Sequence, residues 1–215
     1  MSELLIFCFI KCTNEDTSDT NEEKAMCTKL DELSKLTVEK LYEQYSDLFR
    51  AAPINIEMLL HRLEVPFIEQ DFSEIDGQVG NIKLPEQADE VLGAVSAIAD
   101  KTDPHKDFVK IYVNKFDTYN RKRFTLAHEL GHCMNDAENL KNGFIELRST
   151  SNGSNPKEIE INKVAAEILM PETLLKAEYN KLYIPVLQIL SNKFKVSDNV
   201  MQVRLSDLNM EYVSI

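Results

Sequence analysis

The spacing of hydrophobic residues predicts helices in the first part of the chain. Leu30 and Leu41 belong to a run of apolar residues at helical spacing that contains no Gly or Pro and stops before Pro53. We expect one helix over residues 30–48. A shorter helix is expected to begin after Asn55, because an asparagine side chain readily caps the first turn of a helix.

From residue 66 onward, the pattern changes to short apolar runs separated by Gly and Pro, which is typical of strands joined by turns. In residues 108–113, the apolar side chains of Val109, Ile111 and Val113 alternate with less apolar ones. Alternation of this kind predicts a strand that buries one of its faces.

Helical spacing returns after this strand. Phe124 and Ala127 lie on one side of a helix predicted over residues 118–134. A further helix is predicted over residues 157–169, and the remaining chain to Asp207 also favours helices. Helices around a small group of strands indicate the α+β class.

Length and charge narrow the possible functions. The chain has 215 residues, enough for one domain with small appendages. Its 24 basic and 36 acidic residues give a formal net charge of −12, which argues against duplex DNA or an anionic membrane as a partner. No run reaches the about 18 consecutive apolar residues that a membrane-spanning helix needs.

The first thirty residues differ from the rest. The apolar run at residues 4–10 follows Glu3 rather than a basic segment and lacks a cleavage site, so it is not typical of a signal peptide. Residues 13–24 contain no apolar side chain and are expected to form a mobile link. The four cysteines include no CxxC pair and are too few for a disulfide scaffold, which favours a cytoplasmic protein.

The sequence HELGH at residues 128–132 has the HExxH spacing. On a helix, the imidazoles of His128 and His132 project from one face, close enough to bind one ion, and this geometry suits Zn²⁺. Glu129 is turned by about 100° from His128 and is expected to flank the ion as a general base. The alternative is an ordinary helix with His and Glu at its surface.

A catalytic zinc site needs a third protein ligand. The extended HExxH motif with a further Gly and His is absent, because Asn135 and Glu138 stand in those positions. Glu158 and Glu160 lie at the start of the helix predicted over residues 157–169, and both flank its packing side. Spacing alone does not choose between them, and a glutamate in a first turn also favours the helix dipole without binding a metal.

Two blocks of sequence surround these residues. The first is RFTLAHELGH at residues 123–132, and the second is EINKVAAEILMP at residues 160–171. Together they closely resemble the ImmA/IrrE family of metallopeptidases, and the resemblance extends over about residues 50–208. Position by position, the resemblance places the metal-binding glutamate of the family on Glu160, with Glu158 as the alternative.

The resemblance implies a zincin-like α+β fold, in which a small mixed sheet accompanies the HExxH helix and a packed downstream helix carries the glutamate. It implies a zinc-dependent endopeptidase with His128, His132 and Glu160 as metal ligands and Glu129 as the catalytic residue. Members of the family act in the cytosol on a helix-turn-helix repressor, often encoded nearby on a mobile element. A regulatory protein of this kind is therefore the expected substrate.

The resemblance also divides the chain. We expect a partly flexible N-terminal extension at residues 1–30, a metallopeptidase domain at 31–178 and a C-terminal helical segment packed on the core at 179–215. The last segment resembles a helix-turn-helix around Phe194. From Lys181 onward, however, it has four basic and three acidic residues, too few positive charges for phosphate contacts, so we expect no direct binding of nucleic acid.

A competing interpretation is a non-enzymatic antirepressor or interaction protein whose metal site is structural or vestigial. The intact Glu129 argues against it, because a structural site needs no base. If the chain is a peptidase, we expect the substrate to bind as an extended segment along residues 108–113, used as an edge strand. Cys133, which follows a predicted ligand, is interpreted as a buried residue rather than a redox thiol.

Overall fold

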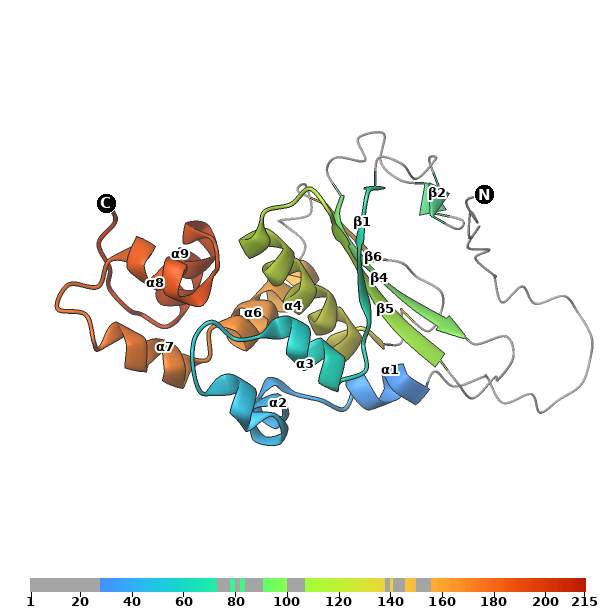
Figure 1. The fold of residues 1–215 in the computed structure, drawn as a ribbon, viewed down its shortest axis with the longest axis horizontal. Helices are drawn as coiled ribbons and strands as arrows, with labels where there is room; N and C mark the ends of the chain where they lie inside the picture. The colour runs from blue at the N-terminus through green and yellow to red at the C-terminus, as the bar shows by residue number, and fades with distance from the viewer. Residues whose placement is uncertain are drawn as a thin grey trace, which may run out of the picture.

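The computed structural model describes residues 28–72, 78–79, 82–83, 91–99, 107–137, 140, 146–149 and 156–215. The predictions for the apolar run at residues 4–10 and the link at 13–24 lie outside the described residues. Helices and a small mixed sheet form an α+β fold, as predicted (Figure 1). No helix in the described part of the chain has the length and apolar character needed to cross a membrane.

The single helix predicted over residues 30–48 is instead three short segments. They are α1 (Thr28–Leu33), α2 (Val38–Gln44) and the 3-10 helix η1 (Ser46–Phe49). The chain turns at Ser34 and Lys35. α2 then begins after Thr37, whose backbone is extended and whose hydroxyl accepts a hydrogen bond from the N–H of Lys40. Leu30 and Leu41 are both fully buried, so their spacing does not reveal the break between them.

The helix predicted after Asn55 is confirmed as α3, Ile56–Arg62. The side-chain oxygen of Asn55 accepts a hydrogen bond from the N–H of Met58 at 2.9 Å. This bond satisfies one of the backbone donors that the first turn of a helix leaves without an intrahelical partner.

The main sheet has four strands in the order β1-β5-β4-β6. They are β1 (Phe67–Gln70), β4 (Val91–Ala99), β5 (Asp107–Asn114) and β6 (Glu146–Ser149), while β2 (Gln78–Val79) and β3 (Ile82–Lys83) pair separately. β1 runs parallel to β5, and β4 is antiparallel to both β5 and β6. β5 confirms the predicted strand, because Val109, Ile111 and Val113 are at most 1% exposed.

β5 is an inner strand, so the prediction that it binds an extended substrate as an edge strand is wrong. Ile111 is opposite Phe67 of β1 on one side and Val95 of β4 on the other. From Ile111 to Val113, both hydrogen-bonding sides of β5 therefore lie against other strands. The outermost strands of the described sheet are β1 and β6.

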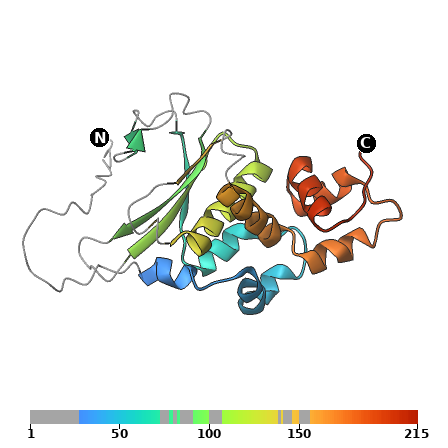
Figure 2. The same cartoon turned by 180° about the vertical axis from the view of Figure 1, so that it is seen from behind.

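The two helices predicted downstream are α4 (Tyr119–Asn135) and α6 (Pro156–Leu169). The helices gather on one side of the sheet, and the view from behind shows the same arrangement (Figures 1 and 2). α4 lies at the centre, in contact with α6, α3, β4 and β5. All of its residues from Arg123 to Met134 are buried for this reason.

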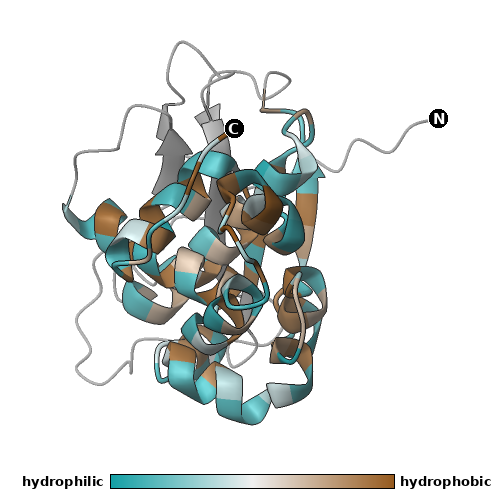
Figure 3. Ribbon diagram, turned by 90° about the vertical axis from the view of Figure 1, so that its left-hand side faces the viewer, coloured by the Kyte–Doolittle hydropathy of each residue, from teal (hydrophilic) through white to brown (hydrophobic). Residues whose placement is uncertain are grey.

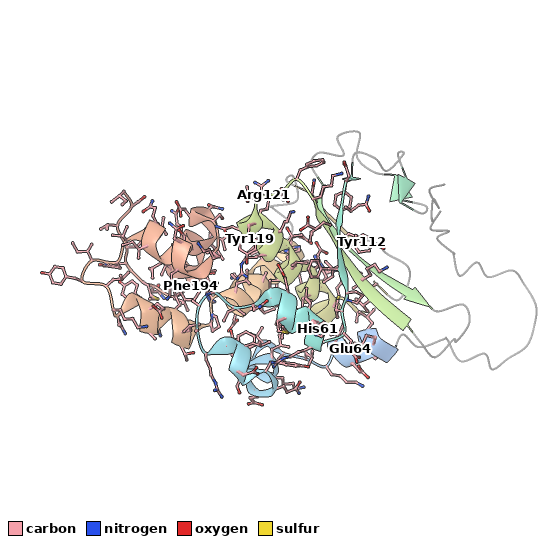
Figure 4. The ribbon with its side chains drawn as sticks, in the orientation of Figure 1. His61, Glu64, Tyr112, Tyr119, Arg121 and Phe194 are labelled. Atoms are coloured by element: carbon pink, nitrogen blue, oxygen red, sulfur yellow. The ribbon has the colours of Figure 1, made fainter. Side chains whose placement is uncertain are left out.

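The C-terminal helices lie beyond α4 and α6, on the side away from the sheet (Figure 1). They are α7 (Glu172–Tyr179), α8 (Leu187–Phe194) and α9 (Asp198–Asp207). Viewed from this end, the helices carry both hydrophobic and hydrophilic residues (Figure 3). Phe194 is fully buried, on the side of these helices that faces the rest of the fold (Figure 4).

The turn between α8 and α9 is joined to the first turns of α4, which carry Tyr119 and Arg121 at their surface (Figure 4). The amide of Asn120 donates to the carbonyl of Val196 at 3.1 Å. The guanidinium of Arg123 donates to the carbonyl of Lys195 at 3.3 Å. The C-terminal helices are therefore attached directly to the helix that carries the HExxH sequence.

Candidate metal centre

α4 holds the HExxH residues deep in the fold. The helix begins after Thr118, whose hydroxyl accepts a hydrogen bond from the N–H of Arg121, and continues over 17 residues without a break. His128 and Glu129 are fully buried and His132 is 1% exposed. Because four residues make just over one helical turn, the two imidazoles lie on the same face.

Glu158 from α6 completes a compact group with the two histidines. The Nε2 atoms of His128 and His132 are 3.0 Å apart. One carboxylate oxygen of Glu158 lies 3.3 Å from Nε2 of His128, and the other lies 3.4 Å from Nε2 of His132. In the described part of the chain, these three residues form the one group of His, Cys, Asp and Glu side chains that could hold a metal ion.

The distances within this group fit a tetrahedral ion. Zinc ligands lie about 2.0–2.2 Å from the metal, so two neighbouring ligand atoms of a tetrahedral site are about 3.3–3.5 Å apart. The distances from the two histidines to the oxygens of Glu158, 3.3 and 3.4 Å, fall in this range, and the 3.0 Å between the two Nε2 atoms is slightly shorter. Two imidazoles and one carboxylate also match the donor set of catalytic zinc sites, which leave a fourth position open.

The structure does not bring Glu160 to the histidines, and the predicted position of the third residue is corrected to Glu158. The side chain of Glu158 is 5% exposed, whereas Glu160 is an exposed residue of α6. Two residues along a helix correspond to a rotation of about 200°, so the two glutamates point in nearly opposite directions. The side that faces α4 includes Ile161 and Ala165, three and seven residues after Glu158.

Two residues that the sequence analysis did not assign lie next to the Nδ1 atoms of the histidines. Nδ1 of His128 is 3.0 Å from the side-chain oxygen of Asn162. Since an amide oxygen only accepts, this contact places the proton on Nδ1 and leaves the lone pair of Nε2 for a metal. Nδ1 of His132 faces Asp136. The sequence does indicate both residues by their spacing, because residues four apart lie on the same face of a helix. Asn162 follows Glu158 by four residues, and Asp136 follows His132 by four.

The environment of His132 favours the neutral imidazole. Burial, followed by the nearby His128, lowers the pKa of His132 to about 4, although the carboxylates of Glu158 and Asp136 act in the opposite direction. The side chain is therefore neutral at pH 7. A neutral imidazole is the form that binds a metal ion.

Gly131, inside the HExxH sequence, allows α4 and α6 to approach closely. A Cβ atom at this position would lie 3.1 Å from Cγ2 of Ile161 and 3.5 Å from Cγ1 of Val164. Ala165 and Ala166 are also buried along α6. The small side chains thus bring Glu158 within reach of the histidines.

A comparison with known protein families identifies the family to which residues 95–206 are similar. The model of a peptidase family described as the IrrE N-terminal-like domain (M78) matches residues 95–206, which is 112 of the 215 residues. The matched region contains the complete His128, His132 and Glu158 group, as well as Glu129. No curated protein matches the chain. Cys133 lies in the same region and is fully buried, in agreement with its interpretation from sequence.

Proposed function

The chain belongs to the peptidase family of the IrrE N-terminal-like domain, and from this premise we propose that it is a zinc-dependent endopeptidase. The observation that carries the proposal is the buried group of His128, His132 and Glu158, with Glu129 beside it on α4. Zinc bound there would lower the pKa of a water molecule and polarise a peptide carbonyl.

The residues of the chain have separate roles in this reaction. His128 and His132, together with the carboxylate of Glu158, would hold the ion. Glu129 acts as the general base that takes a proton from the attacking water, whose oxygen bonds to the peptide carbon. When the C–N bond breaks, Glu129 returns the proton to the amine that leaves.

We further propose that the substrate is a cytoplasmic regulatory protein, in particular a helix-turn-helix repressor. The resemblance of residues 123–132 and 160–171 to the ImmA/IrrE family supports this class of substrate. The deep position of the site adds a requirement, because His128 and Glu129 are fully buried. A peptide bond reaches them in an extended or unfolded segment rather than within a folded domain.

The test uses the purified chain and Glu129→Gln. The wild-type protein should contain about one zinc ion by elemental analysis and cleave the repressor encoded next to its gene, with the products identified by mass spectrometry. Glu129→Gln removes the base but no ligand, so it should keep its zinc and lose about 10²–10⁴-fold in cleavage rate. Glu57→Gln, at an exposed position on α3, is the control.

Two outcomes would contradict the proposal. Normal cleavage by Glu129→Gln would exclude Glu129 as the base. A wild-type protein that binds zinc and the repressor but cleaves neither the repressor nor an unfolded protein would instead favour the non-enzymatic antirepressor.

A further inference from the structure

The two histidines of the metal centre differ in the side chain that lies next to their Nδ1 atoms. Nδ1 of His128 faces a neutral amide, that of Asn162 on α6. Nδ1 of His132 faces a carboxylate, because Oδ2 of Asp136 lies 4.0 Å away, one helical turn further along the chain. At this distance the carboxylate acts electrostatically on the polar N–H side of the imidazole and does not form a hydrogen bond. Asp136 is only 6% exposed, so water screens this contact weakly.

A second residue of α6 holds this carboxylate. Nζ of Lys157 forms an ion pair with Oδ2 of Asp136, the same oxygen that faces His132. Lys157 and Glu158 are adjacent in the first turn of α6. The carboxylate of Glu158 therefore reaches the Nε2 side of His132 directly, while the ammonium group of Lys157 reaches the Nδ1 side through Asp136.

We propose that Asp136 and Lys157 are a positioning pair that sets the metal affinity of His132. The inference rests on the metal site of the proposed function, but not on peptidase activity. A carboxylate facing Nδ1 favours the tautomer with its proton on that nitrogen, so Nε2 presents its lone pair toward Glu158 and His128. The negative charge also makes the imidazole a stronger ligand.

In the proposed arrangement Lys157 acts on metal binding through Asp136. Its ammonium group pairs with this carboxylate and holds the oxygen that faces His132. It belongs to the same helix as Glu158, so metal binding and the docking of α6 on α4 depend on the same first turn. Removing Lys157 should therefore weaken metal binding, and it should do so only while Asp136 is present.

The chain contains a matched ion pair away from the histidines. Nζ of Lys115 lies 2.8 Å from Oδ2 of Asp71, and their side chains are 39% and 8% exposed. The corresponding values for Lys157 and Asp136 are 38% and 6%. Asp71 follows β1 and Lys115 follows β5. Asp71→Asn therefore removes a similar buried charge without touching the metal centre.

The experiment measures the affinity of the full-length chain for Zn²⁺ alone, by competition with a fluorescent chelator at pH 7. Asp136→Asn should weaken binding about 10–100-fold, and Asp71→Asn should leave it unchanged. Lys157→Met should weaken binding less than Asp136→Asn does. The double variant should bind no more weakly than Asp136→Asn, because Lys157 acts through that carboxylate.

Thermal unfolding of the metal-free variants separates positioning from stability. Asp136→Asn and Asp71→Asn should lower the melting temperature to a similar extent, since each loses one buried ion pair. Wild-type zinc affinity in Asp136→Asn would overturn the inference, as would an equal loss of affinity in Asp71→Asn. A wild-type chain that binds no zinc would overturn the metal site as well, whereas one that binds zinc without cleaving protein would overturn only the proposed peptidase activity.

Discussion

The part of α4 that carries the HExxH sequence is enclosed on every side, whereas α6 keeps one face in solvent. In α4, each residue from Arg123 to Met134 is buried. In α6, Glu158 and Ile161 are buried, while Ile159 and Glu160 between them are exposed. The site residues of α4 therefore depend on their spacing along the helix. The site residues of α6 depend on how that helix is rotated against its neighbour.

The largest expected effect tests this rotation directly. Glu158→Gln should weaken zinc binding more than about 100-fold, because it removes the charge of a proposed ligand. Loss of a residue that only orients a ligand costs roughly 100-fold at most. Glu160→Gln is the matched control, two residues away on the exposed side, and should bind zinc normally. Competition with a chelator measures both affinities. The opposite ranking of the two variants would mean that α6 is rotated by about half a turn in the protein.

A smaller effect is expected one turn further along α6. Asn162→Ala removes the acceptor for Nδ1 of His128 and should weaken zinc binding about 10–100-fold. The neighbouring Lys163 is exposed, so Lys163→Ala should have no effect on affinity. Equal affinities of the two variants would show that Asn162 does not orient His128.

The difference between α4 and α6 also explains which residues of the site could be predicted from the sequence. The HExxH spacing carries its own geometry, so His128, Glu129 and His132 could be placed relative to one another before the structure was known. The third residue comes from another helix. Glu158 and Glu160 both flank the apolar side of α6, and the docking of the two helices, through contacts such as that of Gly131 with Ile161, decides between them.

Some elements of the fold could also be predicted from the sequence, whereas others could not. α3 follows from its Asn55 cap and apolar spacing, and α4 and α6 follow from apolar spacing. The break between α1 and α2 was missed because leucines on both sides of it enter one core, which preserves the apolar pattern without a continuous helix. The inner position of β5 was missed as well, since alternation along a strand reports its faces and not which strands pair with its sides.

The contact between the two helices leads to a prediction on stability. Gly131→Val should lower the free energy of unfolding by about 1–3 kcal/mol, because the added atoms would overlap Ile161 and Val164 of α6. Gly131→Ala should have a smaller effect, since alanine favours a helix over glycine by about 1 kcal/mol, which offsets part of the crowding. Urea unfolding measures both. A valine variant as stable as the wild type would mean that the helices are not in close contact.

A second prediction on stability concerns pH and the burial of His132 in α4. In the metal-free protein, burial and the neighbouring His128 lower the pKa of His132 from 6.5 to about 4. Between these two values the unfolded chain binds a proton on this side chain that the folded chain does not bind. The free energy of unfolding should therefore decrease as the pH falls from about 6.5 toward 4, by at most about 1.4 kcal/mol per pH unit from this group. Above pH 6.5 the contribution of His132 should be constant.

His132→Asn isolates this contribution, because other groups also titrate over the same range. The asparagine side chain keeps a polar group at the site but does not bind a proton. Urea unfolding of both metal-free proteins at several pH values should show a shallower decrease in the variant between pH 6.5 and 4, and parallel curves above pH 6.5. Parallel curves over the whole range would mean that His132 titrates normally in the folded chain and that this turn of α4 is open to water.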